Sequence, residues 1–225
     1  MATLDSVQNP GISEEVDPTF RAGRISLRPL EYQTLQGKIL GHYSVVGTSA
    51  AGATAASSNQ AAFRWTDPTN FAVITRVYVS ANVITAVTAQ ATPPINLFIA
   101  RGYTARDGTG ATAISFANPN TNKLRGTMGT TLMTAGNFDV GSAAAGVSGG
   151  TKTVDANPIS TLGLGGLAAI GTQAGGDLYK WDKLGGHPIT LAQNEGLLVQ
   201  WSATAIATGT VSITTLIEWA EVATF

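Results

Sequence analysis

The most constraining feature of this sequence is a two-residue period in its closing segment, GTVSITTLIEWAEVATF. Val211, Ile213, Thr215, Ile217 and Trp219 share one parity, and successive side chains of a β-strand point to opposite faces, so the odd face is predicted to be buried. Four large apolar side chains on this face, each stabilising the fold by about 1.5–3 kcal/mol when buried, would contribute roughly 6–12 kcal/mol. That is comparable to the net stability of a whole domain. We therefore expect the chain to end in a core strand that faces an opposing sheet.

The same period recurs along the chain, where β-branched residues favour strands over helices. In the longest stretch it predicts that Val73 and Val77 share one face and that Ile74 and Tyr78 share the other. No segment shows a sustained 3.6-residue stripe. The further periodic segments are 39–45, a short strand holding Phe63 and Trp65, 71–87, 95–99 and 197–203. The fold class is therefore predicted to be an all-β, antiparallel β-sandwich, jelly-roll-like, of about eight strands.

Two regions break this regularity. Residues 1–30 contain Pro10, Pro18 and Pro29, which disfavour a helix, so an extended N-terminal arm is expected before a sandwich domain spanning 31–225. A frayed tail is the alternative. Within the sandwich, residues 104–177 hold 15 of the 26 glycines and are expected to form long loops with short strands. Those strands are placed near TAISFA (112–117) and RGTMGTTLM (125–133).

Charge is scarce. Lys and Arg total 13, Asp and Glu total 14, and charged residues make up 12% of the chain, about half the roughly 25% of ordinary soluble domains. This favours a surface covered in an assembly, although a Gly/Ala/Ser/Thr surface could also be neutral and hydrated. The net charge of −1 gives no field for nucleic acid or an anionic membrane. Without cysteine or a signal-like N-terminus, the expected place of synthesis is a reducing cytosol.

Motifs for chemistry are weak. Residues 146–150 fit the nucleophile elbow G-x-S-x-G with Ser148 as its serine, but the flanking small residues do not predict the strand and helix that the elbow requires. GLGGLA at 163–168 fits a dinucleotide fingerprint without its βαβ unit. His42 and His187 are far apart in sequence, so a shared metal is not expected. The prediction is no enzyme, no catalytic residue, no cofactor and no metal.

The tryptophans are expected to lie mainly in the core. Trp181, in the polar stretch DLYKWDKLGG, is the one predicted as an exposed binder, because aromatic rings that stand on a polar surface can stack on sugars.

Several stretches resemble virion structural proteins of tailed bacteriophages, notably head decoration (cement) proteins. They are RISLRPLEY, GHYSVVGTS, FRWTDPTNFAVITRVYVS and PITLAQNEGLLVQW. The resemblance implies a jelly-roll homo-oligomer, commonly a trimer, that sits on a capsid and reaches across it with a terminal segment. It implies the major capsid protein or another virion protein as partner, no direct contact with nucleic acid or membrane, and a place in the virion after assembly in the host cytoplasm.

The arm supplies the expected interface with the shell, because proline-stiffened segments lose less freedom on docking. The interface residues predicted there are Pro10, Pro18, Phe20, Arg21, Arg24 and Arg28, with the arginines as ion-pair donors. Three alternatives stay open: a tail or receptor-binding appendage that binds glycans through Trp181, a cytokine-like or complement-like binding module, and a hydrolase at Ser148.

Overall fold

Strands form where the two-residue period predicts them. The computed structural model describes residues 14–16, 23–25, 39–50, 52–53, 57–87, 94–117, 122–124, 128–142, 145–165, 169–181, 187–202 and 209–223. These residues contain strands, turns and loops and no helix, so none of them forms a helix that could cross a membrane. The all-β prediction is confirmed.

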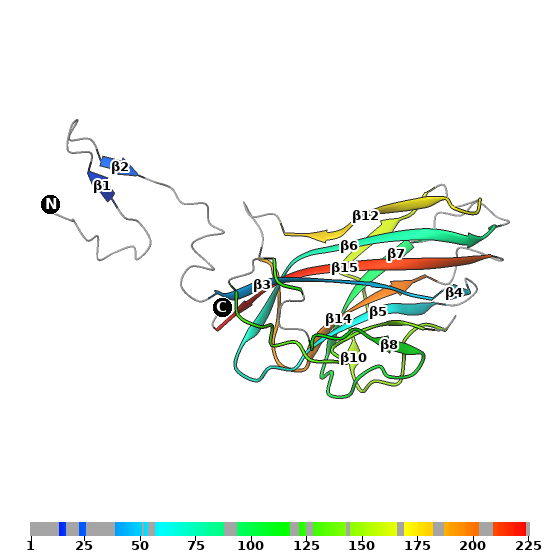
Figure 1. The fold of residues 1–225 in the computed structure, drawn as a ribbon, viewed down its shortest axis with the longest axis horizontal. Helices are drawn as coiled ribbons and strands as arrows, with labels where there is room; N and C mark the ends of the chain where they lie inside the picture. Colours follow the sequence, from blue (N-terminus) through cyan, green and yellow to red (C-terminus); the bar gives the residue numbers. More distant parts are fainter. Residues whose placement is uncertain are drawn as a thin grey trace.

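The strands form two antiparallel sheets (Figure 1). The six-stranded sheet has the spatial order β12 (Gln173–Lys180), β6 (Phe71–Thr85), β15 (Thr210–Val222) and β3 (Ile39–Thr48), with β13 (Ile189–Leu191) on β6 and β4 (Gly52–Ala53) on β15. The seven-stranded sheet has the order β10 (Thr153–Val154), β7 (Pro94–Arg101), β14 (Glu195–Trp201), β5 (Ser58–Trp65), β9 (Phe138–Gly141) and β8 (Ala111–Ala113), with β11 (Ser160–Gly163) on β7. A separate hairpin pairs β1 (Glu14–Val16) with β2 (Gly23–Ile25).

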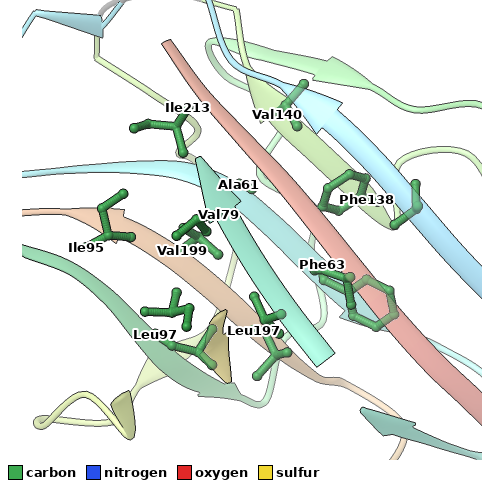
Figure 2. Close-up of a cluster of buried hydrophobic side chains, with 14 of the residues drawn as sticks. Ala61, Phe63, Val79, Ile95, Leu97, Phe138, Val140, Leu197, Val199 and Ile213 are labelled. Carbon is green, nitrogen blue, oxygen red and sulfur yellow. The ribbon is translucent and has the colours of Figure 1, made fainter. Parts of the chain in front are cut away.

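The core lies between the inner faces of the two sheets (Figure 2). Val79 and Ile213 approach it from the six-stranded sheet, and Phe63, Leu97 and Phe138 from the seven-stranded sheet. Because side chains alternate along each strand, one parity of each inner strand meets the opposing sheet. The two sheets therefore form the predicted sandwich.

The closing strand is central, as predicted. β15 pairs with β6 along one edge and with β3 along the other. The side chains at 211, 213, 215, 217 and 219 are all buried. The Trp219 ring lies 5.4 Å from that of Phe63 and is stacked 5.6 Å from that of Tyr43. Aromatic contacts between and within the sheets thus anchor the end of the chain.

A bulge in β6 changes which of its side chains face the core. β15 skips Thr75 in its pairing with β6, so Trp219 lies opposite Ile74 while Glu218 lies opposite Arg76. An extra residue in one strand reverses which parity faces the core. Ile74 therefore shares the core with Val77, and Val73 belongs to a separate cluster. The prediction that Val73 and Val77 share one face is wrong.

The glycine-rich stretch contains more strand than expected. β8 overlaps the predicted TAISFA strand, whereas residues 128–133 of the second predicted segment form none. β9, β10, β11 and β12 were not anticipated. β10, β11 and β12 have mixed or exposed burial patterns, and β9 is buried at all four positions, so none of them has the alternating apolar face that gives a periodic signal.

Candidate functional site

The predicted arm interface falls almost wholly outside the described residues. Pro10, Pro18, Phe20, Arg21 and Arg28 lie outside them. Arg24 lies in β2, where its backbone pairs with that of Glu15 in β1. The interface therefore remains a prediction.

Trp181 is not exposed. Its exposed fraction is 8%, and it packs in a small cluster with Val73, Ala220 and Val222 at one end of the six-stranded sheet. The β6 bulge turns Val73 away from the main core, so the indole has an apolar surface to cover. The prediction of an exposed Trp181 is wrong, because polar neighbours in sequence do not determine what a side chain meets in space.

The described residues do not give the weak chemical motifs the structural context that their chemistry requires. Ser148 is exposed and its backbone bridges to Thr109, and no helix follows it among the described residues. GLGGLA begins in β11, and residues 166–168 lie outside the described part of the chain. His187 is exposed, and His42 lies in β3 opposite Ala220. The described residues contain no group of three acidic or histidine side chains that could hold a metal ion.

The outer face of the six-stranded sheet forms a continuous surface across β3, β15, β6 and β12. Its side chains are half-buried or exposed, and strand pairing places them in adjacent rows. This open face consists of Ser44, Val46 and Thr48 of β3, Ser212, Thr214, Leu216 and Glu218 of β15, Arg76, Tyr78, Ser80 and Asn82 of β6, and Gln173, Gly175 and Asp177 of β12.

Charge on the open face is confined to one end. Arg76 forms an ion pair with Asp177 and lies over the Tyr78 ring, 5.2 Å from its centroid. Hydrogen bonding to Asp177 raises the pKa of Arg76, so this guanidinium stays charged. The next row is apolar: Leu216 lies between Tyr78 and Val46, and Val46 is 53% exposed. Hydroxyl and amide side chains fill the rest, so the face suits contact with another protein surface better than with a polyanion.

The opposite face of the sandwich is covered. Loops from the glycine-rich stretch lie over the outer face of the seven-stranded sheet, where Tyr103 and Val147 pack against Ala62 and Leu198. Arg64 of β5 reaches these loops and donates to the Thr104 carbonyl and to the Asn137 side chain. A second, small core therefore forms outside the main one.

A fully buried carboxylate lies within this covering layer. Asp107 accepts hydrogen bonds from the Tyr103 hydroxyl, from the Gly150 N–H at 2.7 Å and from Lys152 Nζ at 2.6 and 2.7 Å. We call Tyr103, Asp107, Gly150 and Lys152 the Asp107 cluster. Burial alone would raise the pKa of Asp107, but the hydrogen bonds from Lys152, Tyr103 and Gly150 outweigh burial and lower it. Burial and the bond to Asp107 raise the pKa of Tyr103.

A second buried acid stands beside the cluster. Asp139 of β9 pairs with Arg106, whose Nη2 lies 2.9 Å from Oδ1. Burial raises the pKa of Asp139 despite this partner, and the charge of Asp107 adds to the rise. The covering loops are therefore held by ionic pairs as well as by apolar contacts.

Glu221 is a third buried acid, and none of the ion pairs found among the described residues includes it. It accepts hydrogen bonds from the Thr131 hydroxyl, from the Leu132 N–H at 3.0 and 3.1 Å and from Trp219 Nε1 at 3.2 Å. Burial raises its pKa although these donors lower it. Hydrogen bonds to the Glu221 carboxyl group thus connect the loop at 131–132 to the end of β15.

Sequence reasoning did not single out these acids. Glu221 continues the odd parity of the buried face of β15, and that parity was an available signal. Asp107 had none, because its partner Lys152 is 45 residues away in a stretch without periodicity. Searches of family models, curated proteins and solved structures found no match to the chain.

Proposed function

We propose that this protein is a structural virion protein that binds and stabilises a bacteriophage capsid shell as a decoration protein. The open face is the observation that carries the proposal. Its charged side chains, Arg76, Asp177 and Glu218, lie at one end, and the rest is uncharged, with an apolar row of half-buried Tyr78 and Leu216 and exposed Val46. Such a surface is suited to contact between subunits, because few charges need to be desolvated.

We further infer a jelly-roll topology. Of the eight principal strands, β3, β6, β12 and β15 belong to the six-stranded sheet, and β5, β7, β11 and β14 belong to the seven-stranded sheet. Along the chain, successive principal strands therefore change sheet at every step except from β7 to β11. This alternation between sheets, with β3 beside β15 and β5 beside β14, supports two nested Greek keys. The resemblance of the strand sequences to decoration proteins supports the same fold.

In this proposal the open face contacts a neighbouring copy of the chain, and the N-terminal arm contacts the shell. Arg21, Arg24 and Arg28 would pair with acidic groups of adjacent capsid subunits. The appendage alternative depended on an exposed Trp181, and this ring is buried. The described residues offer no feature that favours the binding-module or hydrolase alternatives.

The arm is tested by shell binding. Purified full chain and a variant that lacks residues 1–28 are mixed with shells without decoration protein, and bound copies are counted after pelleting. The full chain should bind, and the shortened chain should stay folded and bind at least ten-fold more weakly. A full chain that fails to bind any shell contradicts the function, whereas full occupancy by the shortened chain contradicts only the clamp.

A charge variant separates the arginines from the rest of the arm. Replacing Arg21, Arg24 and Arg28 together by Ala keeps the length of the arm. If ion pairs carry the contact, this variant should lose binding more steeply than the full chain as salt is raised from low ionic strength. An unchanged binding curve would exclude the arginines as the donors.

A further inference from the structure

The Asp107 cluster brings an amine and a carboxyl group together in a buried site. Lys152 Nζ lies 2.6 Å from one Asp107 oxygen and 2.7 Å from the other. An amine nearly equidistant from both oxygens is also close to the carbon that joins them. Reacting atoms held about 3–3.5 Å apart meet the distance requirement of a near-attack arrangement, and alignment of the amine lone pair with the carboxyl carbon completes it.

The site is buried, and two glycines let the surrounding groups pack closely around it. The Asp107 side chain is fully buried and that of Lys152 is 9% exposed. A Cβ atom on Gly150 would lie 2.5 Å from Asp107 Oδ1, and one on Gly196 would lie 2.8 Å from the Tyr103 ring. The Tyr103 ring also lies against the amine, 5.0 Å from centroid to Nζ. Desolvation penalises both charged forms and so reduces the free-energy difference between the ion pair and the neutral amine and acid, but the hydrogen bonds to Asp107 still keep its pKa low, so the ion pair is the resting form.

Two further donors point at the carboxyl oxygens. The Tyr103 hydroxyl donates to Oδ2, and the Gly150 N–H donates to Oδ1. A fixed donor stabilises negative charge that develops on a carboxyl oxygen during attack at its carbon, and Tyr103 is placed to do this at Oδ2 while the Gly150 N–H positions Oδ1.

We propose that Lys152 and Asp107 form an intramolecular isopeptide bond that covalently ties the two covering loops together. The ammonium gives one proton to Oδ1, and rotation about Cβ–Cγ presents the carboxyl carbon to the neutral amine. The Nζ–Cγ bond then forms, with charge developing on Oδ2 beside Tyr103. The Cγ–Oδ1 bond breaks, and Oδ1 leaves with a second nitrogen proton as water. The three protons of the ammonium end as one on the amide and two on water, so no external reagent is needed.

The bond would close a loop between residues 45 positions apart. Such cross-links stabilise a fold mainly by restricting the unfolded chain. This inference does not depend on the proposed function, and its test uses only the isolated full chain.

The test is the intact mass of the purified full chain. We expect a deficit of one water molecule relative to the sequence mass, and a digest that contains one branched peptide joining the segments around residues 107 and 152. The deficit should persist in denaturant. A chain with its full sequence mass after prolonged incubation under folding conditions overturns the proposal.

A competing reaction gives the same deficit and must be separated. Asp107 precedes Gly108, and an Asp-Gly pair can lose water by closing a succinimide on its own backbone. Lys152→Arg cannot form the isopeptide bond but can still form the succinimide. If the isopeptide bond causes the mass deficit, the deficit should therefore vanish in Lys152→Arg. A deficit that remains in Lys152→Arg, or one without the branched peptide in the native chain, overturns the proposal.

Two matched variants report on the chemistry. Asp107→Asn should reach the same final mass as the native chain, because its amide nitrogen leaves as ammonia. Tyr103→Phe keeps the ring but removes the donor to Oδ2, so the branched peptide should accumulate at least ten-fold more slowly. Equal rates in the native chain and Tyr103→Phe would remove the hydroxyl from the mechanism.

Discussion

At the residue scale, the most informative side chain is Glu221. The odd parity that buries Ile217 and Trp219 continues to Glu221 and carries a carboxyl group into the interior. Three kinds of donor satisfy it: a hydroxyl, a backbone N–H and an indole N–H. Tyr43 and Asp67 are the titratable groups whose charge interacts with it, and burial together with Glu221 raises the pKa of Tyr43 to about 12. Ionised Glu221 therefore has hydrogen-bond donors, but it is repelled by the negative charge of Asp67.

Glu221 predicts a pH dependence of stability. Burial raises its pKa above the ordinary 4.5, so the folded state holds this proton more tightly than the unfolded state. Its stabilising contribution is then full below pH 4.5 and is lost as the pH rises through the folded pKa. Glu221→Gln cannot ionise, so the free energy of unfolding should fall less between about pH 5 and about pH 8 than in the native chain. Urea unfolding at each pH measures this difference.

Glu218→Gln is the control for that measurement. Glu218 is on the solvent-facing side of the same strand, so the substitution removes the same formal charge without changing the core. Other titrating groups, including Asp107, are present in all three proteins and cancel in the comparison. If Glu218→Gln flattens the pH profile as much as Glu221→Gln, the effect comes from net charge and not from burial.

At the element scale, β14 shows how a central strand accommodates layers on both of its faces. It pairs with β5 and β7 and packs its inner residues into the core, while its outer face receives the Tyr103 ring. Gly196 makes this approach possible, because a Cβ there would lie 2.8 Å from the Tyr103 ring as well as 2.2 Å from the Phe63 carbonyl oxygen. The absence of a side chain at one strand position therefore decides how closely the covering loops can pack.

Gly196→Ala should destabilise the protein by about 1–3 kcal/mol, since backbone and an aromatic ring must both move to admit the methyl group. Gly163→Ala, in β11, is a matched control because a Cβ there meets no atom within 4 Å. It should change the free energy of unfolding by no more than about 0.5 kcal/mol. Chemical denaturation of the two variants checks the pair. Equal effects would mean that the contact around Gly196 relaxes freely.

At the scale of the whole molecule, the two outer faces of the sandwich differ. Glycine-rich loops and the Asp107 cluster cover the seven-stranded sheet, whereas the open face of the six-stranded sheet keeps its side chains accessible. Scarce charge therefore has one structural explanation here, because part of the neutral sequence forms a second internal layer over the seven-stranded sheet.

The open face predicts that the chain self-associates. Val46→Asp places a charge in the apolar row at a side chain that is 53% exposed, and burying an unpaired charge between subunits is costly. Val154→Asp, at a side chain 38% exposed in β10 of the other sheet, makes the same chemical change elsewhere. Light scattering should give a multiple of the single-chain mass for the native protein and for Val154→Asp, and a lower mass for Val46→Asp. A native protein that remains monomeric at high concentration would contradict this use of the face.

The sequence by itself determined the strands that carry a regular apolar face. β3, β5, β6, β7, β14 and β15 were all predicted, because alternation is a local property that any extended, half-buried chain must satisfy. The sandwich follows from the same pattern, since each apolar face requires an opposing one. The N-terminal interface residues are still a prediction from composition and resemblance.

Only the tertiary structure decided which residues meet when local periodicity says nothing. The bulge at Thr75 reversed the face of Val73 and gave Trp181 a buried site, because register depends on the neighbouring strand. Asp107 and Lys152 met because loops far apart in sequence fold over the same sheet. Contacts of this kind depend on the path of the chain in space, and no local pattern of residues encodes that path.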